Sequence, residues 1–213
     1  LVFCVARKAS GAMGVAVIPS DAEGVEISPK RFMDLHAHGS LALNSVTSDA
    51  IDWLEGPDVE GGLAKAIDQA TAVLAAEMMG SAREALEQTV TYLGEREQFD
   101  VKLGTFQALQ HRAADNLAAI ELSRSLVYKA AAAIETDAGA PGLASAALSR
   151  CATSALDVCK SAIQLHGGIG FTDEYDIGLY LKRAMTLATR YGTAGLHRKR
   201  YSEVALENGS PKD

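Results

Sequence analysis

The feature that most constrains the fold is helical periodicity, which begins near Glu60 and continues almost to the end of the chain. Leu63, Ile67, Ala70 and Leu74 recur at intervals of four, three and four residues, which places them on one face of a helix. The same pattern returns in later segments, and the joins between them are short. The predicted helices cover 60–92, 106–136, 143–164, 176–189 and 193–208. Helices of this length with short joins and many Ala and Gly residues favour an up-and-down, four-helix-type bundle.

The beginning of the chain has a different pattern, typical of β-strands. Runs rich in β-branched residues lie at 1–6, 14–19, 24–29 and 41–54, separated by turn signals. So few strands need further strands or a helical layer to close a core. We therefore expect an α+β chain, with a partial antiparallel β-domain followed by an all-α bundle. The expected boundaries are 1–55 for the β part, 56–208 for the bundle and 209–213 for a frayed tail.

Composition limits the class of protein. The 213 residues are 48% hydrophobic and 22% charged and have a formal net charge of −7, which suits a soluble globular chain. The acidic balance gives no reason to expect nucleic acid or an anionic membrane as a partner. No apolar run approaches the roughly 20 residues of a membrane span, so we expect a cytoplasmic protein. Because the chain starts without methionine and directly in strand-like sequence, we interpret it as part of a longer protein.

The three cysteines, Cys4, Cys151 and Cys159, have no metal-ligand spacing. Two of them lie in Ala-rich helical sequence, where a reduced thiol packs as a small apolar group. His36 and His38 lie two apart in a predicted strand and would share a face, but no carboxylate or cysteine accompanies them at ligand spacing. We therefore predict no metal site.

The stretch "QLHGGIGFTDEYD", from Gln164 to Asp176, raises a question about close contact. It ends a predicted helix with Gly167, Gly168 and Gly170, although one glycine suffices for a helix C-cap. One interpretation is a tight crossing of two helices. The other is that the bare backbone approaches a ribose or pyrophosphate. No strand precedes the turn, so the Rossmann fingerprint does not apply.

Two further stretches carry charged groups. In "YLGEREQFD", from Tyr92 to Asp100, Arg96 could form a bidentate pair with a phosphate. The alternative is a surface Glu-Arg-Glu cluster beside one core phenylalanine. In "RYGTAGLHRKR", Thr193 is a predicted N-cap of a basic helix, whose charges could equally form a solvated face. We interpret His166 and His197 as structural residues at helix ends.

Taken in order, these stretches resemble the acyl-CoA dehydrogenase family. That family has a long helix ending in Tyr-Leu-x-x-Arg-x-Gln-Phe-Gly, then Phe-Gln-x-x-Gln/His, then Gln-x-x-Gly-Gly-x-Gly, and last a Tyr-Glu-Gly-Thr motif. Here they read "YLGEREQFD", "FQALQH" (106–111), "QLHGGIGFTDEY" and "RYGT". The order and spacing agree over roughly 63–206. Residues 1–55 are similar to the last part of the family's middle β-domain, and we expect the family's N-terminal helical domain to lie outside this sequence.

The resemblance implies a flavoprotein that assembles as a dimer of dimers and binds FAD at its subunit contacts. Gln164, Gly167 and Gly168 would meet the adenosine end of an FAD held mainly by a neighbouring subunit. Arg96, Gln98 and Phe99 would face the pyrophosphate of that FAD, and Thr193 would lie near the FAD of its own site. The implied reaction is α,β-dehydrogenation of an acyl-CoA thioester, with a flavoprotein as electron acceptor. A glutamate would remove the α-proton while the β-hydrogen leaves as hydride.

The sequence departs from this family at the catalytic base. Tyr191 stands where most members have the glutamate, and Ala70 stands at the base position of a minority. Thr71 replaces the arginine that usually follows that position, and Asp100 replaces the glycine of the first motif. A tyrosine, with an ordinary pKa of about 10, is a poor base. We therefore predict no catalytic residue in this chain.

Three functions remain open. The first is the FAD-holding subunit of a heteromeric enzyme, as in the actinobacterial acyl-CoA dehydrogenases of steroid side-chain breakdown, where another subunit carries the base. The second is an active homomeric enzyme with an unplaced base; Glu77 is on the right helix but about two turns too late. The third is a scaffold or interaction module that has lost flavin.

Overall fold

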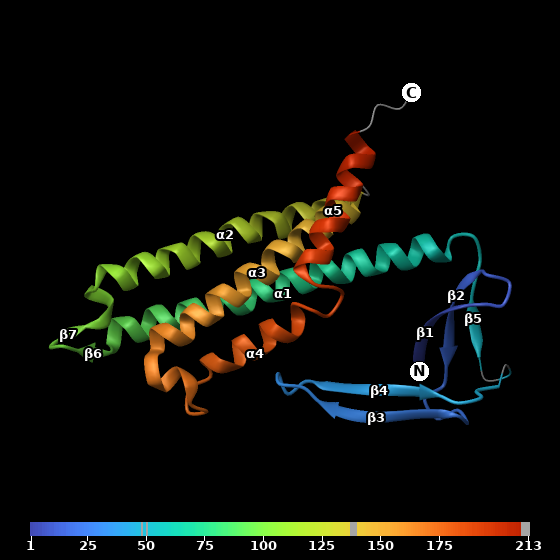
Figure 1. Cartoon of the computed structure of the whole chain (residues 1–213), viewed down its shortest axis with the longest axis horizontal. Helices are drawn as coiled ribbons and strands as arrows, with labels where there is room; N and C mark the ends of the chain where they lie inside the picture. Colours follow the sequence, from blue (N-terminus) through green and yellow to red (C-terminus); the bar gives the residue numbers. More distant parts are fainter. Residues whose placement is uncertain (48, 50, 137–139, 210–213) are drawn as a thin grey trace. The chain divides into compact units, whose positions relative to one another are not determined.

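A computed structural model describes residues 1–47, 49, 51–136 and 140–209 (Figure 1). The chain divides into two compact units, Leu1–Ala66 and Ile67–Asp213. Strands dominate the first unit and helices the second, so the predicted α+β order is confirmed. The predicted tail falls largely on 210–213, outside the described residues. The predicted boundary at 55/56 stays a prediction.

The first unit holds two small antiparallel sheets. Strands β1 (Val2–Arg7), β2 (Met13–Ile18) and β5 (Asp52–Leu54) form one sheet in the order β1-β2-β5. Strands β3 (Val25–Arg31) and β4 (Ala37–Leu43) form the other.

The first unit buries little apolar surface. Among its described residues, the buried hydrophobic ones are Ala16 and Ile18 on β2, at 4% and 2% exposure, whereas Phe3 is 65% exposed and Ile27 is 50% exposed. This agrees with the expectation that these strands do not close a core by themselves.

One prediction about this unit is wrong. His36 lies before β4 rather than within a strand, because the chain turns at Leu35, whose φ is 61°. His38 is in β4, so the two histidines do not share a strand face. The structure also supplies a carboxylate that spacing did not suggest. An Asp34 oxygen lies 3.6 Å from His36 Nδ1 and another lies 3.9 Å from His38 Nε2.

The second unit is a helical bundle, and its elements fall close to their predicted ranges. Within the described residues the α-helices are α1 (Val59–Glu95), α2 (Gln107–Thr136), α3 (Ala140–His166), α4 (Ile177–Leu187) and α5 (Ala194–Gly209). A two-residue hairpin, β6 (Glu97–Gln98) and β7 (Val101–Lys102), and the short 3₁₀ helix η2 (Leu103–Thr105) join α1 to α2. A second 3₁₀ helix, η3 (Gly167–Phe171), follows α3.

The core of the bundle lies along α1 and α3. On α1 the buried positions 71, 75, 78, 82, 85, 89 and 93 recur every three or four residues, as an amphipathic helix requires. On α3, small side chains such as Ala147, Cys151 and Ala155 are fully buried and permit close packing. Ile67, expected on the buried face of α1, is 40% exposed. Asp68 takes the buried position beside it, because it pairs with Arg200 of α5.

Polar contacts connect the helices. Arg200 of α5 binds the Asp68 carboxylate through both terminal nitrogens, at 2.5 and 3.1 Å. Arg183 of α4 contacts the Glu77 carboxylate of α1 at 2.6 Å. Between α2 and α3, the Ser123 hydroxyl donates to Ser154 Oγ at 2.9 Å in a buried position. These contacts fix the register of the helices whose ends form the site described next.

Candidate functional site

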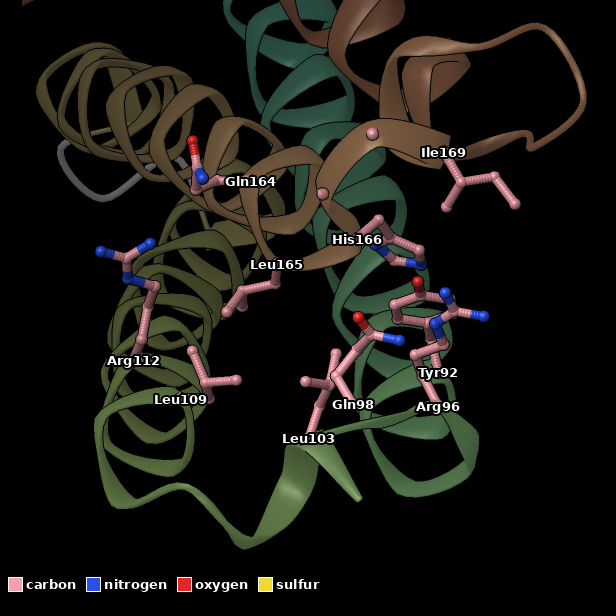
Figure 2. A pocket seen from close by; sticks show the side chains of 12 residues that line it. Tyr92, Arg96, Gln98, Leu103, Leu109, Arg112, Gln164, Leu165, His166 and Ile169 are labelled. Carbon is pink, nitrogen blue, oxygen red and sulfur yellow. The ribbon is translucent and has the colours of Figure 1, made fainter. Parts of the chain in front are cut away.

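A cavity of about 540 Å³ lies at the end of the bundle where α1 ends, α2 begins and α3 gives way to η3 (Figure 2). Its lining combines polar groups and glycines with a patch of aliphatic side chains. The lining residues are Tyr92, Arg96, Gln98, Leu103, Leu109, Arg112, Gln164, Leu165, His166, Gly167, Gly168 and Ile169. Segments separated by more than fifty residues in the sequence therefore meet at one site.

The hairpin after α1 positions Arg96 and Gln98. The Arg96 N–H donates to the Tyr92 carbonyl at 2.8 Å, and the Arg96 carbonyl accepts from the Leu103 N–H at 2.8 Å. At the hairpin tip, Phe99 and Asp100 both have positive φ, 57° and 64°, as a type I′ turn requires. A phenylalanine is an outlier there, and Asp tolerates the conformation better. This explains how Asp100 can replace the family's glycine.

The three glycines of the next turn serve different purposes. Gly167 has φ 64°, a left-handed conformation that suits glycine. A Cβ on Gly170 would lie 2.7 Å from the Ile163 carbonyl oxygen, so close helix packing excludes a side chain. Gly168 has no such reason among the described residues: nothing lies within 4 Å of its Cβ position, and it lines the cavity. Gly170 is thus packed against the end of its own preceding helix rather than at a crossing of two helices, and the approach of a ribose or pyrophosphate to the open backbone of Gly168 stays a prediction.

The cavity carries positive charge. Arg96 and Arg112 line it, and neither forms a side-chain hydrogen bond or ion pair with any of the described residues. No carboxylate is among the described residues that line it, although the chain as a whole has a net charge of −7. Two unpaired guanidinium groups at one cavity favour an anionic ligand, and a guanidinium plane can bind phosphate oxygens or stack on an aromatic ring.

His166 lies beside the cavity as a neutral ring. Its Nδ1 donates to the Ala162 carbonyl at 2.8 Å, while its Nε2 has no hydrogen-bond partner among the described residues. Burial lowers the pKa of His166, and the bond to Ala162 only partly opposes this. The ring stacks on Tyr92 with centroids 4.5 Å apart, so it supports the wall that carries Tyr92 and adds no positive charge.

Of the seven residues predicted to contact FAD, the structure brings five together. Arg96, Gln98, Gln164, Gly167 and Gly168 line the one cavity. Phe99 is not part of the lining. It is 84% exposed, and its ring contacts the Phe106 ring edge-on, with the ring centroids 6.3 Å apart. Thr193 is not part of the lining and caps α5, because its Oγ1 accepts from the Leu196 N–H at 3.3 Å.

Several lining residues were not predicted from the sequence. The aliphatic members, Leu103, Leu109 and Leu165, have the spacing of ordinary core positions and give no signal of their own. Arg112 had a signal that was not used, since it directly follows the recognised segment 106–111. Its role becomes visible only when α2 is placed opposite α1.

The two base positions of the family lie in a region organised by a buried polar network. Ala70 is half-buried on α1, and the hydroxyl of the adjacent Thr71 donates to the Ile67 carbonyl at 2.7 Å. The Tyr191 side chain is 42% exposed, and its carbonyl accepts from His197 Nε2 at 3.1 Å. Within the described residues, neither position offers a carboxylate or another strong base.

His197 connects that loop to the buried ion pair. Its Nδ1 accepts from the Ser145 hydroxyl at 3.2 Å, and Ser145 Oγ accepts from Arg200 at 3.3 Å. Burial is the main cause that lowers the pKa of His197, so the ring is neutral near pH 7. The chain from Asp68 through Arg200, Ser145 and His197 thus holds the Tyr191 backbone in place.

The cysteines and the possible metal ligands can be judged only within the part of the chain that the structure describes. All three cysteines are free thiols, and burial raises the pKa of Cys151 and Cys159 to about 12, which keeps these two in the unreactive thiol form near pH 7. No cluster of three or more His, Cys, Asp or Glu side chains that could hold a metal occurs among the described residues. Over the same residues, no helix is long and apolar enough to cross a lipid bilayer.

Comparison with known proteins gives one consistent family. The model of the acyl-CoA dehydrogenase C-terminal domain matches residues 63–206. Acyl-CoA dehydrogenase IpdE2 of Mycolicibacterium smegmatis is 38% identical over 158 residues, which are 73% of this chain and 45% of that protein. The probable acyl-CoA dehydrogenase fadE25 of Mycobacterium leprae is 30% identical over 215 residues, or 96% of this chain and 54% of that protein.

A solved structure shows the same fold. The ChsE4-ChsE5 complex from Mycobacterium tuberculosis matches with a TM-score of 0.88 and 25% identity, covering 98% of this chain and 56% of that one. The match includes the strands as well as the bundle. The chain spans about half the length of the curated relatives it matches.

Proposed function

The chain belongs to the acyl-CoA dehydrogenase family, and we propose that it is an FAD-associated subunit that completes a neighbour's flavin site without supplying the catalytic base. The observation that carries this proposal is the convergence of Arg96, Gln98, Gln164, Gly167 and Gly168 on one cavity. These are the residues that match the family's motifs for the adenosine and pyrophosphate parts of FAD.

The residues that line the cavity fit the adenosine diphosphate part of FAD. Arg96 has no competing carboxylate among the described residues and can bind a diphosphate oxygen in a bidentate pair. The space next to Gly168, which a side chain would fill, leaves room for a ligand at the backbone. Gln164 carries both a donor and an acceptor and can bind the edge of an adenine or a ribose hydroxyl. Bound FAD would supply redox chemistry by accepting the substrate's β-hydrogen as hydride.

The absence of a base rests on both family positions. Abstraction of an α-proton needs a carboxylate whose pKa is raised by a desolvated pocket. Ala70 cannot accept a proton, and Tyr191 carries a phenol, not a carboxylate, and is 42% exposed. The nearest carboxylates on α1 are engaged: Asp68 binds Arg200 and Glu77 binds Arg183. The contact of Glu77 argues against the homomeric alternative in which Glu77 acts as base.

A heteromeric assembly would explain why the chain has residues that fit FAD but has no catalytic base. The chain's flavin-binding surface would join a base-bearing subunit that dehydrogenates an acyl-CoA between its α and β carbons and passes electrons to an acceptor flavoprotein. The likeness to a subunit of the ChsE4-ChsE5 complex supports this arrangement. The scaffold alternative is not favoured, because a module without flavin has no need of two unpaired arginines at an open glycine backbone.

The proposal is tested by flavin content. We would purify the protein in the assembly in which it is isolated and measure the flavin released on denaturation. Arg96→Gln should lower the flavin content, whereas Arg124→Gln should not, because Arg124 contacts Glu121 on the exposed side of α2. A colourless wild-type protein that does not bind added FAD would refute the proposal.

A further inference from the structure

We propose that Arg112 is an additional nucleotide-binding residue, which contacts the adenine ring at the end of the cavity opposite Arg96. The inference rests on the proposed function and deepens it, because it divides the cavity into a phosphate end and a base end. It concerns a residue outside the motifs that match the family.

Arg112 lies across the cavity from Arg96. Figure 2 shows Arg112 and Gln164 at one side of the cavity and Arg96, Tyr92 and Gln98 at the other. The two guanidinium groups come from different segments, Arg112 from α2 and Arg96 from the residue that follows α1. One diphosphate bound at Arg96 and Gln98 therefore leaves Arg112 facing the remainder of the ligand.

The side chains next to Arg112 suit a planar base. Leu109 and Leu165 line the cavity next to Arg112, so the surface there is apolar and suits the face of a planar base better than a phosphate. A guanidinium plane stacks on nucleic-acid bases and its N–H groups can donate to their ring nitrogens. Gln164 on the same side can bind the adenine amino group and N7, as amide side chains do in nucleic-acid recognition.

Arg112 does not hold any part of the described fold together through a polar contact. Its side chain makes no hydrogen bond or ion pair with any of the described residues, and it is exposed. By contrast, Arg124 on the same helix binds Glu121 at 2.7 Å and the Tyr128 hydroxyl at 3.1 Å. The guanidinium group of Arg112 is therefore free to contact a ligand that enters the cavity it lines.

The experiment compares three ligands and four variants. Adenosine, ADP and FAD would be titrated against the purified flavin-free assembly, with ligand-observed NMR for the first two and flavin fluorescence for FAD. The variants are Arg112→Gln, Arg112→Lys, Arg96→Gln and the control Arg124→Gln, each checked for folding by circular dichroism. Arg124→Gln removes the same charge from the same helix without touching the cavity.

We expect Arg112→Gln to weaken adenosine, ADP and FAD by a similar factor of about ten, which corresponds to about 1.4 kcal/mol. Arg112→Lys should not restore binding, because the ammonium group lacks the planar fork. Arg96→Gln should weaken ADP and FAD but leave adenosine unchanged. Arg124→Gln should bind all three ligands like the wild type.

Two results would overturn the inference while leaving the proposed function intact. In the first, Arg112→Gln binds every ligand as the wild type does while Arg96→Gln loses FAD. In the second, Arg112→Gln weakens ADP but not adenosine and Arg112→Lys restores it, which would make Arg112 a phosphate contact. A wild-type protein that binds neither FAD nor ADP would overturn both proposals together.

Discussion

The ion pair between Asp68 and Arg200 predicts which of its two single variants loses more free energy of unfolding. The Asp68 carboxylate is 4% exposed, whereas the Arg200 side chain is 34% exposed. Arg200→Met therefore leaves a buried charge without its bidentate partner, which typically costs about 3–5 kcal/mol. Asp68→Ala leaves an arginine that can turn toward water and still contact Ser145, so we expect a loss of about 1–2 kcal/mol.

The double variant gives the decisive comparison. Once Arg200 has been replaced, Asp68→Ala removes a stranded buried charge, so the second substitution should stabilise the protein. We expect Asp68→Ala/Arg200→Met to be more stable than Arg200→Met by about 1 kcal/mol or more. Its loss relative to the wild type should stay below the sum of the single losses.

Urea unfolding followed by the helical circular dichroism signal measures these differences. A loss of about 3 kcal/mol in Arg200→Met should lower the urea midpoint by roughly 1.5 M if the slope is about 2 kcal/mol per M. The reasoning would be refuted if Asp68→Ala destabilised the Arg200→Met variant further. It would also fail if Arg200→Met alone cost less than about 1 kcal/mol.

Three further predictions concern the turn, the buried histidines and the core. Gly170→Ala should destabilise the bundle by about 1–3 kcal/mol, because its Cβ would lie 2.7 Å from a carbonyl oxygen, while Gly168→Ala should unfold like the wild type but retain less flavin. The pKa of His166 and of His197 is lowered by burial, so the unfolded chain takes up protons before the folded chain does. Stability should therefore fall as pH drops below about 6.5, by up to about 1.4 kcal/mol per pH unit for each ring, and a stability that is flat between about pH 7 and 5.5 would contradict this. Met78→Ala should cost about 2–5 kcal/mol in chemical unfolding, since the side chain is fully buried on α1, and a smaller loss would mean that the neighbouring side chains collapse into the space.

Much of the fold followed from local pattern. The spacing of apolar residues fixed the helices to within a few residues, because one buried face per helix dominates their energetics. The same logic failed at Ile67, where periodicity expects a buried apolar residue and the structure buries Asp68 instead. Asp68 is buried because it pairs with Arg200, more than a hundred residues later, and the pattern of neighbouring residues does not reveal such a partner.

The site was predictable only in part, for a similar reason. Motif order identified the two sides that carry Arg96 and Gln164, but Arg112 and the leucines enter the cavity through the packing of α2 against α3. His36 and His38 show the opposite case, because a single residue with positive φ, Leu35, ends the strand pattern that alternation had suggested. Residues whose roles depend on tertiary contact or on local strain are the ones that sequence reasoning missed.

The measurement that tests the central claim most directly is the absorption spectrum of the flavin before and after addition of an acyl-CoA. It would be recorded for the protein purified alone with FAD added and for the protein co-expressed with a base-bearing subunit of the same family. The account predicts that substrate bleaches the flavin only in the co-expressed sample. Bleaching in the protein alone would contradict it, and would mean that a carboxylate elsewhere in this chain removes the proton, since positions 70 and 191 hold Ala and Tyr.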